Sequence, residues 1–156
     1  MKNKQFMLKN LISLGLVLMC FASSSCEKEN NNTFTQVYQF GEIVKWQKVE
    51  PTYSQSDLYL SEARIRFLDF EGDRSELFNT VFNGVKQSIS THIIQLNPDD
   101  EPCKAMLRLG RHIDKYITDV LEYDVEIIYM VGKSPSITGD TCPVVEGEVV
   151  YTRDGG

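Results

Sequence analysis

The sequence predicts an α+β fold in which an antiparallel sheet of about four strands carries two amphipathic helices on one face. Three observations support this class. Apolar and polar residues alternate near the start and the end of the folded part, as in strands with one buried face. Between these regions, two longer segments repeat apolar residues every three or four positions, as in helices that bury one side. Turn-forming residues separate most of the segments and indicate the order ββααββ.

The composition is that of an ordinary globular protein. Of the 156 residues, 42% are hydrophobic and 24% are charged, which excludes an intrinsically disordered or collagen-like chain. The formal net charge of −6 argues against nucleic acid as a partner. Residues 34–156 are enough to bury a substantial core, so we expect them to form one globular domain.

Residues 34–49 predict a long first strand. Four large apolar residues share one parity along it: Tyr38, Phe40, Val44 and Trp46. Three smaller apolar residues have the other parity: Val37, Ile43 and Val49. Gly41 lies in the middle of the segment, where it indicates a bulge or a bend.

Residues 58–70 predict a second strand. Their composition suits a helix, yet the apolar residues would surround a helix on all sides. A strand separates the side chains into two sets. Tyr59, Ala63, Ile65 and Phe67 face one way, and Glu62, Arg64 and Arg66 face the other.

The first helix is predicted to follow an N-cap at Asp73 or Ser75, whose side chains can accept hydrogen bonds from the amides of the first turn. Its apolar residues share a face about 160° wide. They are Leu77, Phe78, Val81, Phe82, Val85, Ile89 and Ile93. The outer face is uncharged, with Asn79, Thr80, Asn83, Gln87, Ser90 and Thr91. Such a face suits packing on a partner, hydrogen bonding to sugars, or plain solvation.

The second helix is predicted to start after Asn97-Pro98 and to run to about Glu122. Three acids lie at its positive end: Asp99, Asp100 and Glu101. Its expected buried face comprises Cys103, Met106, Gly110, Ile113, Ile117, Val120 and Leu121. Two strands, residues 125–131 and 144–151, complete the sheet.

The N-terminus has the features of a secretory signal, residues 1–25. Lys2, Lys4 and Lys9 precede residues 11–22, which are apolar apart from Ser13. This run is shorter than the ~20 apolar residues that span a bilayer. A membrane anchor that stays uncut is the alternative.

The segment ends in Ser23-Ser24-Ser25-Cys26, which resembles the lipobox of bacterial lipoproteins. The resemblance implies that Cys26 is lipidated and becomes the first residue of the mature chain. Glu27, Lys28 and Glu29 follow, similar to the acidic export signal of Bacteroidota lipoproteins. An outer-membrane lipoprotein facing the periplasm or the cell surface is therefore implied. Residues 26–33 would tether the domain to the membrane.

Cys103 and Cys142 are the two cysteines of the domain. In an exported protein, two such residues predict one disulfide. The predicted helix and the strand after it have similar lengths, so the chain would return to the vicinity of Cys103 shortly before Cys142. Two reduced, buried thiols and a metal site are the alternatives, although a metal needs more ligands than two distant cysteines.

Four cations form a stripe on the second predicted helix: Lys104, Arg108, Arg111 and Lys115. They agree in direction within about 60°. The stripe suits a phosphate, a sulfated glycan or an acidic partner, or it is an ordinary outward face.

Aromatic and imidazole side chains are the other candidates. Trp46 and Tyr53 are candidates for the rim of a glycan-binding or partner-binding surface. His92 is expected to pack in the core and His112 to be exposed. Neither histidine has the sequence neighbours of a general base or a metal ligand.

No motif of a known catalytic or cofactor site stands out. The acidic clusters lack the spacing of a calcium loop, and we expect no metal and no cofactor. The sequence favours a membrane-anchored envelope lipoprotein with a non-catalytic binding or accessory role in an envelope assembly. A surface glycan-binding module is one alternative. A hydrolase with an unrecognised pair of carboxylates is another.

Overall fold

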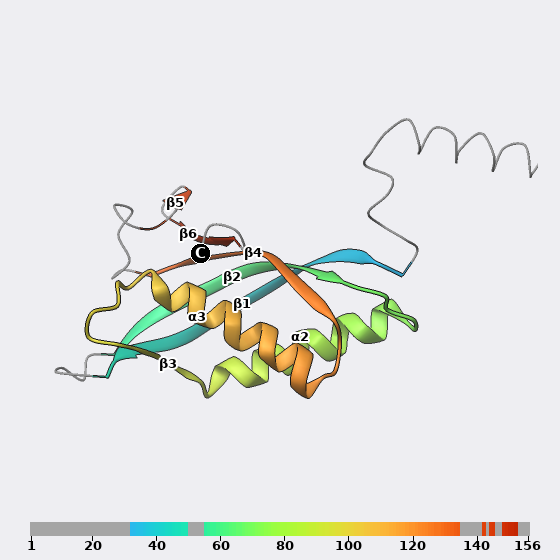
Figure 1. Cartoon of the computed structure of the whole chain (residues 1–156), viewed down its shortest axis with the longest axis horizontal. Coiled ribbons are helices and arrows are strands. Elements are labelled where there is room, and N and C mark those ends of the chain that lie inside the picture. The colour runs from blue at the N-terminus through green and yellow to red at the C-terminus, as the bar shows by residue number, and fades with distance from the viewer. Residues whose placement is uncertain (1–31, 50–54, 135–141, 143, 146–147, 153–156) are drawn as a thin grey trace, which may run out of the picture.

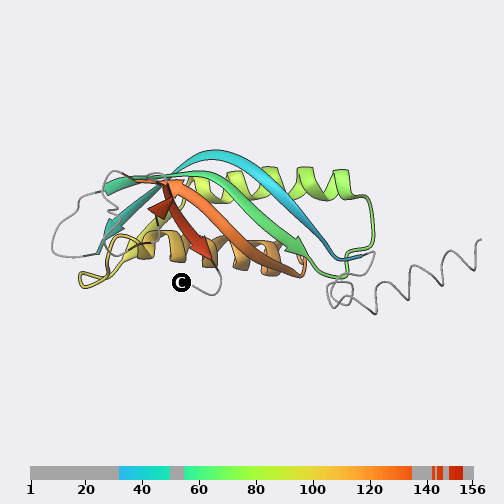
Figure 2. The ribbon, with the colours of Figure 1, turned by 90° about the horizontal axis from the view of Figure 1, so that it is seen from above.

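The computed structural model describes residues 32–49, 55–134, 142, 144–145 and 148–152. The predicted signal segment, Cys26, residues 27–31 of the tether and Tyr53 lie outside these residues. In the described part, two helices pack on one face of a twisted sheet, which confirms the α+β class (Figure 1, Figure 2). None of its helices is long and apolar enough to cross a membrane.

In the described residues, the sheet has six strands in the order β3-β1-β2-β4-β6-β5. Their bounds are β1 Phe34–Lys48, β2 Gln55–Phe67, β3 Ile93–Leu96, β4 Val125–Lys133, β5 Val144–Val145 and β6 Glu148–Thr152. All neighbours are antiparallel except β1 and β3, which run parallel. The prediction of a purely antiparallel sheet is therefore wrong. The single strand predicted over 144–151 is in fact two short strands that pair with each other.

Strand β3 was missed because its first residue continued the apolar face of the preceding helix. That helix, α2 Arg74–Ser90, starts after the predicted N-cap Asp73, which accepts hydrogen bonds from the amides of Ser75 and Glu76. It ends before Ile93, contrary to the prediction. Ile94 and Leu96 are both buried, and the period-two pattern of a strand allows this. The order is thus ββαβαβββ rather than ββααββ.

Two irregularities shape the long strands. In β1 the register shifts between Gln39 and Glu42, and Gly41 has a φ of 60°, as the glycine predicted. In β2 the register against β4 shifts between Leu60 and Glu62. This bulge changes the parity of the buried residues, which are Leu58 and Leu60 before it and Ala63, Ile65 and Phe67 after it. Tyr59 is therefore 39% exposed, and its predicted place on the core face is wrong.

The second helix, α3 Lys104–Lys115, continues into a π-helical turn, η2 Tyr116–Val120. The amide of Leu121 donates to the carbonyl of Tyr116, five residues back. The wider turn rotates the buried face, because each π turn takes up more residues than an α turn. Val120 is consequently 62% exposed, and its predicted burial is wrong.

The helices divide the sheet between them. Helix α2 packs on β1, whereas α3 packs on β3, β4 and β6. Figure 2 shows β1 and α2 along one side of the molecule and β4, β6 and α3 along the other. The amino-terminal end of α3 follows the edge strand β3 by a short connection, residues 97–103, and the two elements enclose the site described next.

Candidate functional site

A shallow pocket of about 340 Å³ lies between helix α3 and the edge strand β3. It is lined by His92, Ile93, Ile94, Gln95, Arg108, Arg111, His112 and Lys115. Four of these residues belong to α3 and occupy positions 108, 111, 112 and 115. This spacing places their side chains on one side of the helix. Three of the four cations of the predicted stripe therefore converge on one cavity.

The two histidines of the pocket are in direct contact. The centroids of the His92 and His112 rings are 3.8 Å apart, and the ring planes differ by 10°. Ser88 of α2 brings its Oγ within 3.4 Å of His112 Nε2. Burial lowers the pKa of both rings below 6.5, and the neighbouring His112 lowers the pKa of His92 further. Both rings are therefore neutral at pH 7.

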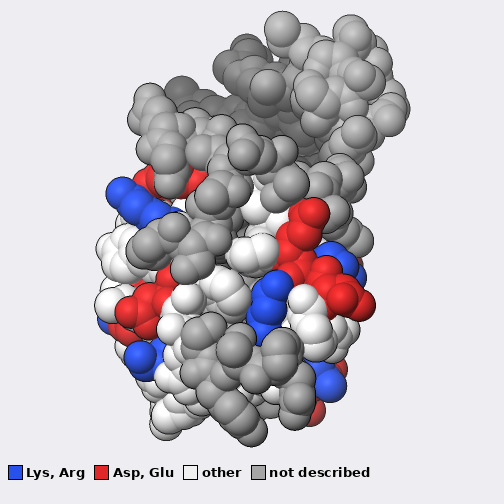
Figure 3. Space-filling view, turned by 90° about the vertical axis from the view of Figure 1, so that its left-hand side faces the viewer, with Lys and Arg blue, Asp and Glu red and all other residues white. Residues whose placement is uncertain are grey.

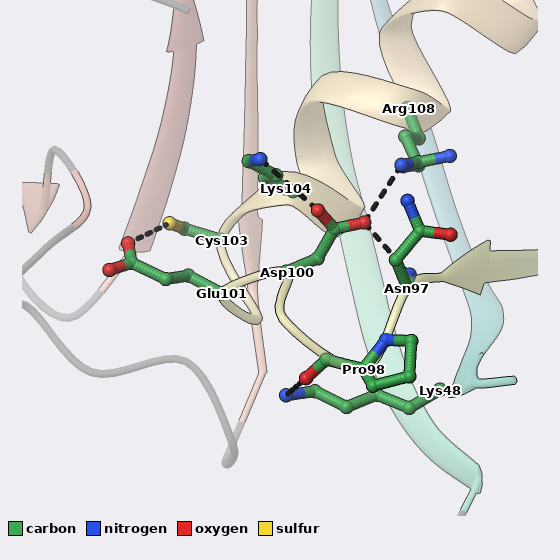
Figure 4. A network of polar contacts seen from close by, with 8 residues as sticks. All are labelled: Lys48, Asn97, Pro98, Asp100, Glu101, Cys103, Lys104 and Arg108. Carbon is green, nitrogen blue, oxygen red and sulfur yellow. Dashed lines mark hydrogen bonds and ion pairs between the residues drawn. The ribbon is translucent and has the colours of Figure 1, made fainter. Parts of the chain in front are cut away.

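Arg108 is held in place by Asp100, which lies in the turn before α3 (Figure 4). Its terminal nitrogen donates to Asp100 Oδ2 over 2.8 Å. The same oxygen accepts the amide of Asn97 at 2.8 Å, and Lys104 Nζ lies 3.1 Å from the other oxygen. The side chain of Asp100 is only 8% exposed. These partners, the Asn97 amide first, lower the pKa of Asp100, so the carboxylate stays ionised and fixes Arg108.

The cationic stripe is therefore divided in the structure. Lys104 pairs with Asp100 and does not line the pocket. Arg111 and Lys115 line it, and in the described residues neither forms an ion pair with a carboxylate. Two cations are thus available to a ligand, beside a third that is already oriented. Sequence reasoning missed both histidines as pocket residues, because no periodicity connects positions on two different elements.

Trp46, another predicted site residue, does not join this pocket. Trp46 is 5% exposed and belongs to the core, so it cannot rim a binding surface, and that prediction is corrected. Tyr53 and Cys26 lie outside the described residues.

The predicted disulfide between Cys103 and Cys142 is not found among the described residues of the structure. Cys103 Sγ lies 3.7 Å from Glu101 Oε2, in hydrogen-bond geometry, and Cys142 is buried. The prediction placed the two residues by the lengths of a regular helix and strand. The thiol of Cys103 instead follows the turn before α3 and points to a neighbouring carboxylate (Figure 4).

A second cavity, of about 450 Å³, lies between the segments that follow β2 and η2. It contains four acids, Asp69, Glu71, Glu122 and Asp124, together with Phe67, Phe70 and Tyr123. All four acids are exposed to solvent. A catalytic acid needs a desolvated carboxyl group, so this cavity does not favour the hydrolase alternative. Within the described ranges, no group of three or more His, Cys, Asp or Glu side chains is placed to hold a metal ion.

Charges of both signs are mixed on the end of the molecule that Figure 3 shows. Cationic and anionic side chains alternate there, as on an ordinary solvated surface. The α3–β3 pocket differs from this background in holding cations and histidines with no acid in its lining. Comparison of the chain with protein-family models, with curated proteins and with solved structures gave no match.

Proposed function

We propose that this chain is a lipid-anchored envelope protein whose domain binds an anionic group, of the sulfate or phosphate class, in the α3–β3 pocket. The role is one of recognition, within an envelope assembly or at its surface. The observation that carries the proposal is the convergence of Arg108, Arg111 and Lys115 on one cavity in a chain with a net charge of −6. Cations gathered against the overall charge indicate a specific anionic ligand rather than general attraction.

The pocket is organised for this task before any ligand arrives. Asp100 holds Arg108 through one N–H group, and a guanidinium has five such groups. Arg108 can therefore donate to an oxyanion without losing its support. A preoriented arginine reduces the loss of side-chain entropy on binding.

The uncharged polar side chains of the pocket can orient a bound ligand by hydrogen bonds. Gln95 and the two neutral imidazoles can form hydrogen bonds with the anionic group or with a sugar hydroxyl beside it. A sulfated or phosphorylated glycan would satisfy both the cations and these groups. These groups support the glycan-binding alternative that the sequence raised.

Titration of the chain with inorganic sulfate tests the proposal, because sulfate presents the anionic group alone. Two-dimensional NMR should show saturable shifts of the His92 and His112 ring signals. Replacing Arg111 with Gln should weaken the affinity by about tenfold, the value of one charge-assisted hydrogen bond. The control is Lys133→Ala, which removes an exposed cation that pairs with Glu148 away from the pocket. Equal affinities for the two variants would refute the site.

A further inference from the structure

Ser88 of α2 determines which nitrogen of the neutral His112 ring carries the proton. Ser88 Oγ donates its single hydrogen to the carbonyl oxygen of Val85 over 3.1 Å. In the 3.4 Å contact between Ser88 Oγ and His112 Nε2, the ring nitrogen must therefore be the donor. A neutral imidazole has one N–H group and one bare nitrogen. His112 Nδ1 is therefore the bare nitrogen, which can only accept a hydrogen bond.

The electrostatics of His112 agree with this assignment. Burial has the larger effect and lowers the pKa of the ring, whereas a hydrogen bond with the backbone of Ser88 raises that pKa. An acceptor beside an N–H group has this effect, because it stabilises the protonated form. His92 differs, since among the described residues no hydrogen bond engages its ring. The proton of His92 can therefore occupy either nitrogen, as a ligand requires.

The other polar side chains of the pocket can all donate hydrogen bonds. Arg108, Arg111 and Lys115 carry N–H groups and no acceptor. The side-chain oxygen of Gln95 already accepts a hydrogen bond from Gln47 Nε2 at 3.2 Å, so the NH₂ group of Gln95 is left to donate. The lining thus combines several donors with one fixed acceptor, His112 Nδ1.

This combination distinguishes two anions that share a tetrahedral shape. Each oxygen of sulfate can accept a hydrogen bond, and none can donate one. Hydrogenphosphate has the same form, but one of its oxygens carries a proton and can donate. Beside His112 Nδ1, a sulfate oxygen would face an unshared electron pair without a hydrogen, whereas the hydroxyl of hydrogenphosphate would form a hydrogen bond. A site that binds a hydroxyl group in this way discriminates against an analogue that lacks it.

We propose that the α3–β3 pocket selects hydrogenphosphate over sulfate, with His112 Nδ1 accepting a hydrogen bond from the hydroxyl group of the anion. This inference rests on the proposed function and names the ligand of the same site. His112 determines the specificity. Arg108, Arg111 and Lys115 supply the attraction that both anions share.

Calorimetric titration of the full chain in detergent with inorganic phosphate, inorganic sulfate and methyl phosphate tests the proposal. At about pH 8.5 all three anions carry close to two negative charges, and only inorganic phosphate retains a proton. We expect phosphate to bind at least ~10-fold more tightly than sulfate, and methyl phosphate to bind as weakly as sulfate. Equal affinity of phosphate and either other anion would overturn the preference and leave the proposed function intact. Binding of none of the three would refute both.

Two variants separate specificity from attraction. His112→Phe keeps a flat ring against His92 but removes the acceptor, so the preference for phosphate should disappear while sulfate binds no more weakly. Arg111→Gln removes a donor that serves both anions, so both affinities should fall by a similar factor and the preference should remain. A preference that survives His112→Phe would overturn the proposal.

Nitrogen-15 NMR of the unmodified chain adds a measurement that does not depend on how a variant folds. The imidazole signals distinguish a protonated ring nitrogen from a bare one. At the same pH, His112 should carry its proton on Nε2, and addition of phosphate should shift the signal of the bare Nδ1 more than addition of sulfate does. A proton on Nδ1 would exclude the proposed role of His112.

Discussion

The imidazole rings of His92 and His112 stack in parallel with their centroids 3.8 Å apart, although one residue precedes β3 and the other lies in α3. Two neutral rings tolerate this contact. Two cationic rings at about 4 Å would repel by ~4 kcal/mol at an effective dielectric constant of ~20. Arg108, Arg111 and Lys115 of α3 add to that repulsion, whereas Ser88 of α2 and Gln95 of β3 are uncharged. An anion in the pocket would offset it.

Sulfate affinity should therefore increase as the pH falls from about 8 to about 5.5. Burial lowers the pKa of both rings from its ordinary value, so the rings are neutral at the higher pH and take up protons as the pH falls. Each added proton attracts sulfate, whose own charge stays constant over this range. Calorimetry at several pH values measures the effect, and His112→Gln should flatten the profile. An affinity that does not depend on pH would contradict this role of the stack.

Asp100→Asn should lower the thermal midpoint at neutral pH. The neutral amide keeps the size of the side chain but leaves Lys104 and Arg108 without their carboxylate partner. The folded-state pKa of Asp100 is below its ordinary value of 3.8, so its stabilisation is present above 3.8 and is lost as the pH falls through the folded-state value. The variant and the unmodified chain should thus converge in acid. Calorimetric scans from neutral to strongly acidic pH would show whether they do.

Gly132→Ala should destabilise the fold by ~1–3 kcal/mol through overpacking. A methyl group at this position of β4 would lie 2.6 Å from the carbonyl oxygen of Tyr59, which is backbone and cannot move alone. Gly84→Ala is the comparison, since its methyl group would meet the hydroxyl end of Tyr116, a side chain that can rotate away. Urea denaturation should rank the first change as clearly worse. Similar losses would mean that β2 and β4 separate more readily than their pairing suggests.

Cys26→Ala should release the protein from the membrane fraction. The lipobox-like segment makes Cys26 the expected site of lipidation, and acyl chains hold such proteins on the bilayer. Fractionation of cells and immunoblotting measure the change. Cys20→Ala serves as the control, because Met19 before it is larger than the residue that precedes a lipidated cysteine. Retention of Cys26→Ala in membranes would disprove the anchor.

Local features of the fold were predictable because neighbouring residues determine them. Asp73 caps α2 through amides two and three residues away, and Gly41 permits the bulge of β1 by its own conformation. The burial pattern of β1 follows from alternation alone. The π turn after α3 was not predictable, because no side chain near Tyr116 distinguishes it from an α-helical turn.

Contacts between segments that are far apart in the chain could not be predicted from the sequence. Strand β3 forms because Ile94 and Leu96 are buried beside β1. Only the assembled sheet provides that buried position. The candidate site shows the same division. Its cations were predicted from helical spacing, but the stacking of His92 on His112 depends on where β3 lies. The burial of Trp46 likewise depends on the helices that cover its face of the sheet.

The residues that line the α3–β3 pocket belong to two elements, which separate when the chain unfolds. A ligand held there can bind only the native state, so binding and folding share one equilibrium. At ~10 times its dissociation constant, such a ligand adds about 1.4 kcal/mol to the free energy of unfolding. That is a rise of a few degrees in the melting temperature. A melting-temperature screen over anions and sulfated or phosphorylated sugars would therefore report the natural ligand of this protein without any prior assay of its activity.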